Sequence, residues 1–117
     1  MSKIVFTFPG QGAQSVGMGK AFYDASREAR DIYQRANQYL GYDLAALCFE
    51  GPPEELTRTD RCQPALLTTG YAAYAALIAK SSLTQPMAVA GLSLGEITAL
   101  VVANAISFKD AVYIVQV

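Results

Sequence analysis

The chain has 117 residues, of which 52% are hydrophobic and 16% are charged, against about 25% charged residues in an average soluble domain. This composition excludes a disordered chain and indicates helices or strands that are covered on more than one side. The net charge is −1 at pH 7 without a run of basic residues, so the sequence predicts no nucleic-acid partner and no binding to an anionic membrane.

The first part of the chain predicts a strand, a tight turn and two helices. Residues 4–8 are rich in β-branched and aromatic side chains and end at a Pro-Gly pair, which is typical of a strand buried on both faces. A short helix is expected over residues 18–23. The clearest helix starts at Ser26, a capping residue, and ends at Gly41. Its apolar side carries Ala29, Ile32, Tyr33, Ala36 and Leu40.

The middle of the chain predicts one small and one long helix. After a Gly-Pro-Pro break, Glu54 and Glu55 suit the first turn of a small helix. Pro64 is typical of a helix start, and the helix is expected to continue to Lys80. One face of this helix carries Leu67, Tyr71, Tyr74 and Ile78, and alanines line much of the rest. Because no wide polar face is left, we expect this helix to pack inside a larger body.

The last part of the chain predicts a second strand and two further helices. Residues 87–92 read as a buried strand and residues 95–103 as a helix. Ser107 followed by Asp110 is a variant of the capping box and predicts another helix, whose apolar positions are Ala111, Val112, Ile114 and Val115. Strands that alternate with helices indicate an α/β fold with a parallel sheet and helices on both of its faces.

Metal binding, secretion and membrane insertion find little support in the sequence. Cys48 and Cys62 form no Cys-x-x-Cys pair and the chain has no histidine, so we expect two buried, reduced thiols and no metal site. The N-terminal apolar run is too short for a signal peptide. The apolar stretch over residues 87–106 contains Glu96, which costs about 2.5–3.5 kcal/mol at the centre of a bilayer. A cytoplasmic protein is therefore expected.

The segment from Gly91 to Gly95, Gly-Leu-Ser-Leu-Gly, has the pattern of a nucleophile elbow. In this turn a serine sits between a strand and a helix in a strained conformation that exposes its hydroxyl. Glycines two residues to either side are needed because strand and helix pass closely. The turn also directs the N–H of the next residue, Leu94, toward negative charge that develops nearby. Ser93 is therefore the candidate nucleophile, and Glu96, in the first helical turn, needs only a dipole-compensating role.

The glycine-rich turn Gly10-Gln11-Gly12 is the second motif. It does not match a phosphate-binding loop, since Ser15 stands where the dinucleotide pattern requires glycine and Met18 where a Walker loop requires lysine. Two interpretations remain open from the residues alone. The turn either supplies a second backbone N–H to an oxyanion hole or is an ordinary glycine turn.

Three segments in this order carry a family resemblance: Phe-Pro-Gly-Gln-Gly at residues 8–12, Gln-Pro-Ala-Leu-Leu at 63–67 and Gly-Leu-Ser-Leu-Gly-Glu at 91–96. Their spacing resembles the N-terminal third of malonyl-CoA:acyl carrier protein transacylases, and the resemblance spans essentially the whole chain. It implies that residues 1–117 are the N-terminal part of the large, α/β-hydrolase-like subdomain, with the family's ferredoxin-like small subdomain absent from this chain. The last helix stops without a cap, so we expect a chain truncated at its C-terminus.

The resemblance implies a role for five residues. Ser93 would take a malonyl group from coenzyme A as an ester and pass it to the phosphopantetheine thiol of acyl carrier protein in fatty acid biosynthesis. The backbone N–H groups of Gln11 and Leu94 would form the oxyanion hole. Gln63 would lie near the acyl pocket, and Leu92, where the family usually has histidine, would line it. No separate cofactor is implied, because malonyl-CoA and the phosphopantetheine of acyl carrier protein arrive as substrates.

The family's catalytic histidine and its carboxylate-binding arginine lie downstream of the matching segments, and this sequence contains no histidine. We therefore expect the 117 residues alone to be close to inert. One alternative is the acyltransferase unit of a polyketide or polyunsaturated-lipid synthase, although a start at Met1 favours a stand-alone enzyme. A serine esterase also uses the elbow, but tends to carry a His-Gly-Gly type of loop in place of Gly-Gln-Gly. A non-enzymatic alternative is a module that docks carrier protein.

Overall fold

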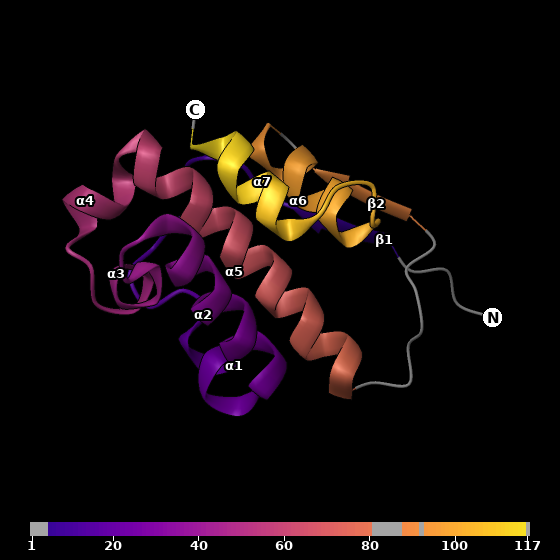
Figure 1. Ribbon diagram of the computed structural model, residues 1–117, viewed down its shortest axis with the longest axis horizontal. Coiled ribbons are helices and arrows are strands. Elements are labelled where there is room, and N and C mark those ends of the chain that lie inside the picture. Colours follow the sequence, from indigo (N-terminus) through magenta and orange to yellow (C-terminus); the bar gives the residue numbers. More distant parts are fainter. Residues whose placement is uncertain (1–4, 81–87, 92, 117) are drawn as a thin grey trace.

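The computed structural model describes residues 5–80, 88–91 and 93–116. Within these residues the order is β1 (Val5–Phe8), α1 (Lys20–Ala25), α2 (Arg27–Leu40), α3 (Leu44–Glu50), α4 (Pro53–Thr57), α5 (Thr59–Lys80), β2 (Ala88–Gly91), α6 (Leu94–Val102) and α7 (Phe108–Val115). The long helix α5 crosses the centre of the molecule, with α1 to α4 on one side and both strands, α6 and α7 on the other (Figure 1). The mixed α/β class predicted from the sequence is confirmed.

The two strands form a parallel pair, as predicted, with Val5 opposite Ala88 and Phe8 opposite Gly91. Burial of β1 differs from the prediction, because Val5 is 56% exposed and only Phe8 is fully buried. Side chains alternate along a strand, and in the described part of the chain α5 and α6 pack only on the side that carries Phe6 and Phe8. Residues 4, 87 and 92 of the predicted strands lie outside the described residues.

The helix predicted between Ser26 and Gly41 is α2. The Ser26 hydroxyl accepts a hydrogen bond from the N–H of Ala29, and Gly41 ends the helix with φ of 80°. These are the two terminal devices that the sequence indicated. The buried residues are Ala29, Ile32, Tyr33 and Ala36, and Leu40 is half-buried.

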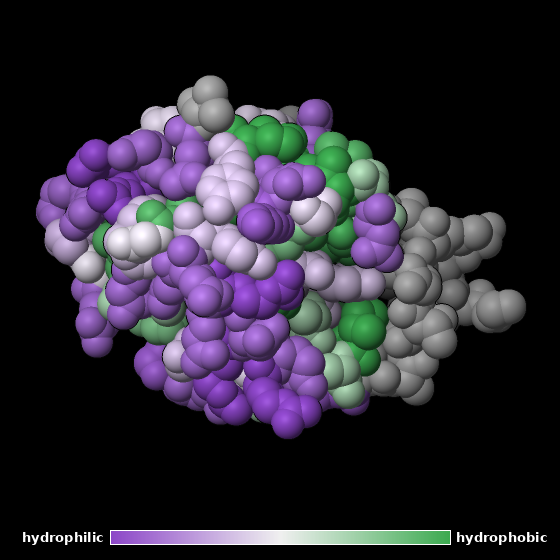
Figure 2. All heavy atoms as spheres, viewed as in Figure 1, coloured by the Kyte–Doolittle hydropathy of each residue, from purple (hydrophilic) through white to green (hydrophobic). Residues whose placement is uncertain are grey.

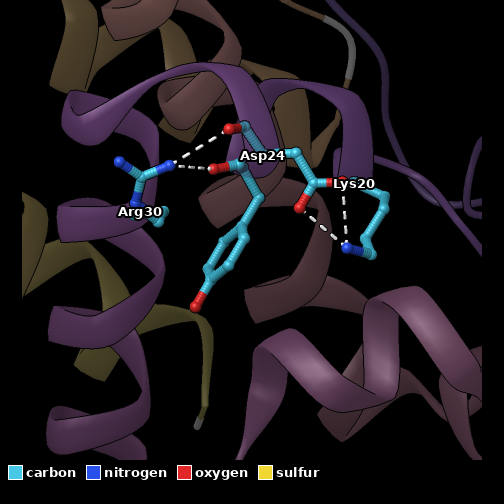
Figure 3. Close-up of polar contacts among 4 residues, drawn as sticks. Lys20, Asp24 and Arg30 are labelled. Carbon is cyan, nitrogen blue, oxygen red and sulfur yellow. Dashed lines mark hydrogen bonds and ion pairs between the residues drawn. The ribbon is translucent and has the colours of Figure 1, made fainter.

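Polar contacts join α1 to the start of α2 (Figure 3). The Arg30 guanidinium donates hydrogen bonds to the carbonyl oxygens of Tyr23 at 2.9 Å and of Asp24 at 3.2 Å. These carbonyls belong to the last turn of α1, where acceptors lack partners within the helix. Lys20 pairs with Asp24 at 2.8 Å along the exposed side of α1, a surface contact that adds little stability. Arg30 therefore holds the short helix α1 against α2.

The central helix α5 begins at Thr59, five residues before the start predicted at Pro64. Proline suits a first helical position, but Pro64 is the sixth residue of α5, so it lies inside the helix and leaves out one backbone hydrogen bond there. The first turn is closed by hydrogen bonds from the N–H groups of Arg61 and Cys62 to the carbonyl of Arg58, at 3.0 and 2.6 Å. Burial runs through Cys62, Pro64, Ala65, Leu66, Leu67, Thr68, Ala72 and Ala76. The expectation of a helix packed on several sides is confirmed.

Sequence analysis missed α3, which begins after Asp43, whose carboxylate accepts a hydrogen bond from the N–H of Ala46 at 3.0 Å. The small helix at Glu54 and Glu55 is α4, and Ser107 caps α7 through the N–H of Asp110, both as predicted. In the α7 stripe three positions are buried, whereas Ile114 is 52% exposed. The exposed apolar residues Leu100, Tyr113 and Ile114 lie on α6 and α7, where hydrophobic residues gather in Figure 2, while α1 and α2 carry hydrophilic ones.

Both cysteines are buried free thiols, as expected, and burial raises the pKa of Cys48 to about 12. The hydroxyl of Thr69 on α5 lies 2.7 Å from the Tyr33 hydroxyl on α2 and 4.0 Å from the Cys48 sulfur on α3, so these polar groups face one another where the three helices meet. Across the residues that the structure describes, no helix has the length and apolar character needed to span a membrane.

Candidate functional site

Ser93 lies at the junction between β2 and α6, at the N-cap position of the helix. Its backbone has φ of 57° and ψ of −118°, a conformation that costs a residue with a side chain about 1–3 kcal/mol. The side chain is exposed and makes no capping hydrogen bond to the helix. The strained strand-to-helix turn predicted from the sequence is therefore present, and no hydrogen bond of its hydroxyl is found within the described residues.

The two glycines that flank the serine are required by close packing. A Cβ atom on Gly91 would overlap the carbonyl group of Gly95, where the end of β2 meets the first turn of α6. A Cβ atom on Gly95 would overlap the carbonyl oxygen of Phe8 and lie 3.1 Å from that of Pro9. The elbow is thus packed closely against its own strand and the end of β1, as its glycine spacing indicated.

This packing brings the two sequence motifs to one edge of the sheet. Because β1 and β2 are parallel with Phe8 opposite Gly91, both strands end at the same edge. The loop that follows Phe8 therefore leaves the sheet beside the elbow, and Gly95 contacts the backbone at the loop's first residue, Pro9. Residues 9–14, which we call the glutamine loop, and Ser93 are neighbours in the fold although about 80 positions separate them in the sequence.

Two backbone donors of the glutamine loop are used within the loop itself. The N–H of Gly12 donates to the side-chain oxygen of Gln14 at 2.8 Å, and the N–H of Ala13 donates to the carbonyl of Gly10 at 3.3 Å. The N–H of Gln11 donates to no acceptor within the described part of the chain. It is therefore available to a ligand at the sheet edge.

Two contacts attach the glutamine loop to the first turn of α5. The Gln11 side-chain amide donates to the Thr59 hydroxyl at 3.2 Å. Burial raises the pKa of the Cys62 thiol, and a backbone hydrogen bond with Gly12 opposes that shift. Gln63 is half-buried on the same helix, four residues after Thr59, so the two side chains share a helix face.

The remaining sequence-predicted site residues lie as follows. Leu94 is the first residue of α6 and its side chain is 5% exposed, so only its backbone can contribute to chemistry. Its N–H stands at the positive end of the helix dipole, among donors that lack partners within the helix. Glu96 is exposed in the first turn, consistent with compensation of the dipole. Leu92 lies outside the described residues.

Sequence reasoning missed Thr59, because the helix start was placed at Pro64 and Thr59 fell in a presumed loop. A helix begun five residues earlier would have put Thr59 one turn before Gln63 on the same face. It also missed an apolar, open cavity of about 470 Å³. The cavity is bounded by β1, α5 and the glutamine loop, including Phe6, Phe8, Pro9, Tyr74 and Leu77, and Ser93 is not among its lining residues.

The arrangement combines an exposed serine hydroxyl with backbone donors from two segments. Such donors stabilise the oxyanion that forms when a nucleophile attacks an ester or thioester carbonyl. A serine hydroxyl also needs a base to accept its proton, most often histidine, and the sequence has none. An exposed serine hydroxyl beside unpaired backbone donors is an arrangement that acyl transfer through a covalent serine ester can use.

The chain belongs to the acyl transferase domain family, whose sequence pattern it matches over residues 5–117. It is 51% identical over 116 residues to the malonyl CoA-acyl carrier protein transacylase of Bacillus subtilis, covering 99% of this chain and 36% of the relative. The chain thus spans little more than a third of the length of that relative.

Solved structures agree with the sequence relatives. The acyl-carrier-protein S-malonyltransferase of Burkholderia pseudomallei superposes with a TM-score of 0.92 at 47% identity, covering 98% of this chain and 37% of that one. A complex of a type II PKS acyl-carrier protein with its malonyl-transacylase matches with a TM-score of 0.91 at 40% identity, covering 98% and 37%. The fold of this chain is therefore that of the corresponding part of these proteins.

Proposed function

We propose that the full-length protein transfers a malonyl group from coenzyme A to the phosphopantetheine thiol of acyl carrier protein in fatty acid biosynthesis. The Ser93 oxygen attacks the thioester carbonyl of malonyl-CoA, the carbon–sulfur bond breaks, and coenzyme A leaves as the thiol with the proton taken from serine. The phosphopantetheine thiol then attacks the serine ester, a new thioester forms and Ser93 regains its proton. Coenzyme A thioester and phosphopantetheine are substrates, and no further cofactor takes part.

The observation that carries this proposal is the strained, exposed Ser93 beside the glutamine loop. In it the N–H groups of Gln11 and Leu94 stabilise the oxyanion, where one such donor is worth about 2.7–4 kcal/mol of barrier. Gln63 and Leu92 border the acyl group. The relatives support malonyl as that group, since both the sequence relative and the solved structures are named for malonyl transfer.

The base and the group that binds the malonyl carboxylate are assigned to residues outside this sequence, because it contains no histidine. The 117 residues then act as the N-terminal part of the large subdomain of the acyltransferase. We place the protein in the cytoplasm, which its proposed substrates support.

The test is intact mass measurement of the full-length protein after incubation with malonyl-CoA. We expect a mass increase of one malonyl group, and none in the Ser93→Ala variant. Addition of acyl carrier protein bearing phosphopantetheine should remove the malonyl group from the enzyme and add it to the carrier. Ser107→Ala is the matched control, because that serine caps α7 and lies outside the site.

Three results would refute the proposal. The wild type forms no adduct, the adduct persists in Ser93→Ala, or the acyl group is released to water and never reaches the carrier thiol. The last result would assign the protein to the serine esterases instead.

A further inference from the structure

The hydrogen bonds inside the glutamine loop involve Gly10, Gly12, Ala13 and Gln14, and none of them holds Gln11. The residues of the loop are largely exposed, and glycines on either side of Gln11 leave the backbone free to rotate. Gly12 has φ of 110°, which other residues rarely adopt. The direction of the Gln11 N–H depends on the dihedral angles at Gly10 and Gln11, so a small rotation of the backbone would redirect this donor. A contact with a residue outside the loop is therefore needed to hold the Gln11 N–H in one direction.

The first turn of α5 provides a rigid point of attachment. The carbonyl of Arg58 accepts hydrogen bonds from Arg61 and Cys62, and the Arg58 guanidinium pairs with Asp60 at 2.8 Å. Thr59 stands within this closed turn and accepts the Gln11 side-chain amide at 3.2 Å. This is a contact across 48 positions of sequence between the glutamine loop and the central helix α5.

We propose that Thr59 is a positioning residue, which holds the Gln11 side chain so that the Gln11 backbone N–H faces the oxyanion beside Ser93. This inference rests on the proposed function and adds a residue that acts through Gln11 rather than touching substrate.

The contact has the features of a positioning bond rather than of a stabilising one. The Gln11 side chain is exposed, so water can satisfy its amide if Thr59 is lost, and no buried polar group is left unpaired. Its loss should therefore leave the stability of the fold almost unchanged. The effect should appear in the step that needs the Gln11 N–H, because a donor helps only where it is already aimed at the developing charge.

The experiment compares Thr59→Val with Thr59→Ser in the full-length protein. Valine keeps the shape of threonine but cannot accept the Gln11 amide, whereas serine keeps the hydroxyl. We expect Thr59→Val to slow formation of the malonyl-enzyme and to lower kcat about tenfold, with little change in KM and in melting temperature. Thr59→Ser should stay within about twofold of the wild type.

Two further variants sharpen the comparison. Thr57→Val is the matched control, since Thr57 is also an exposed threonine and its hydroxyl donates to the carbonyl of Pro53 at 2.8 Å within α4. It should acylate at the wild-type rate. Gln11→Ala removes the other end of the contact, and the double variant with Thr59→Val should be no slower than Gln11→Ala alone, because both changes break one interaction.

The outcomes separate this inference from the function on which it rests. If the wild type forms no malonyl-enzyme, the proposed function fails. If the wild type is acylated but Thr59→Val is acylated equally fast, the positioning role is refuted and the function stands. The role is also refuted if Thr59→Ser is as slow as Thr59→Val, or if the loss in Thr59→Val is explained by a smaller fraction of folded protein.

Discussion

Ser26 and Ser93 both occupy the N-cap position of a helix, and the structure uses them in opposite ways. Ser26 has an extended backbone with φ of −133°, is 2% exposed, and accepts the N–H of Ala29 at 3.2 Å. Ser93 has φ of 57°, is exposed, and caps nothing. The Ser26 hydroxyl stabilises its helix by capping it. The Ser93 hydroxyl does not cap its helix, and the Ser93 backbone is strained.

The difference comes from what precedes each serine. Ser26 follows the last turn of α1, where the chain reverses through an ordinary extended residue. Ser93 follows a strand whose end is pressed against α6 and β1, and the glycines at 91 and 95 make that approach possible. The conformation of a capping serine thus depends on its own helix alone. The conformation of the elbow serine depends on the close packing of β2, α6 and the end of β1. Substitutions in the two regions should therefore have different consequences.

The largest effect is expected from Gly95→Ala. The new methyl group would overlap the carbonyl oxygen of Phe8, which belongs to a paired strand and cannot move aside cheaply. We expect a loss of about 3 kcal/mol or more in the free energy of unfolding, at the upper end of overpacking effects, together with loss of acylation. Chemical denaturation and intact mass measurement report the two quantities.

Gly41→Ala is the control for that substitution. Gly41 has a left-handed backbone, with φ of 80°, but a Cβ atom there would meet nothing within 4 Å. Only the conformational penalty should remain, about 1–2 kcal/mol, with acylation preserved. If Gly95→Ala loses no more unfolding free energy than Gly41→Ala, the elbow is not packed as closely as the structure describes.

Ser93→Gly should separate strain from chemistry. Glycine adopts the Ser93 conformation without penalty, so we expect the free energy of unfolding to rise by about 1 kcal/mol after the entropy of the unfolded glycine is subtracted. Acylation should be lost completely, because the nucleophile is gone. Thermal unfolding of the variant against the wild type checks the first expectation.

Asn104 offers a comparison for this gain in stability. It is also a non-glycine residue with positive φ, at 62°, but asparagine tolerates the left-handed region. Asn104→Gly should therefore change the stability by only a few tenths of a kcal/mol. A stability of Ser93→Gly at or below the wild-type value would show that no strain is stored at the elbow.

The sequence predicted the features that depend on local signals better than those that depend on contacts between distant segments. The helix α2 was predicted in full, because its cap, its apolar spacing and its terminal glycine are all local signals between Ser26 and Gly41. The conformation of Ser93 was also predictable, since the glycine spacing has one steric explanation. The start of α5 was predicted wrongly, because proline signals a helix start in isolation and the first turn here begins at Thr59.

What the sequence could not give were contacts between distant segments. Which side of β1 is exposed depends on which helices cover the sheet. The residues from Ile4 to Phe8 predicted an apolar strand but not its exposed side. The contact between Gln11 and Thr59 spans 48 positions and involves two ordinary polar residues, so no local pattern indicates it. The glutamine loop had two open interpretations for the same reason, because only the parallel register of β1 and β2 brings the end of β1 to the elbow.

The smallest effect is expected at the other serine of the comparison. Ser26→Ala removes the acceptor for the Ala29 N–H at a buried cap and should cost about 1 kcal/mol of unfolding free energy, measured by urea denaturation. Acylation by malonyl-CoA should proceed at the wild-type rate, because Ser26 belongs to the α1–α2 junction and not to the sheet edge. A slowed acylation in a folded Ser26→Ala protein would contradict this division, since it would couple the helical side of the molecule to Ser93. An unchanged rate beside a measurable loss of stability would show that two serines at equivalent helix positions serve folding and chemistry separately.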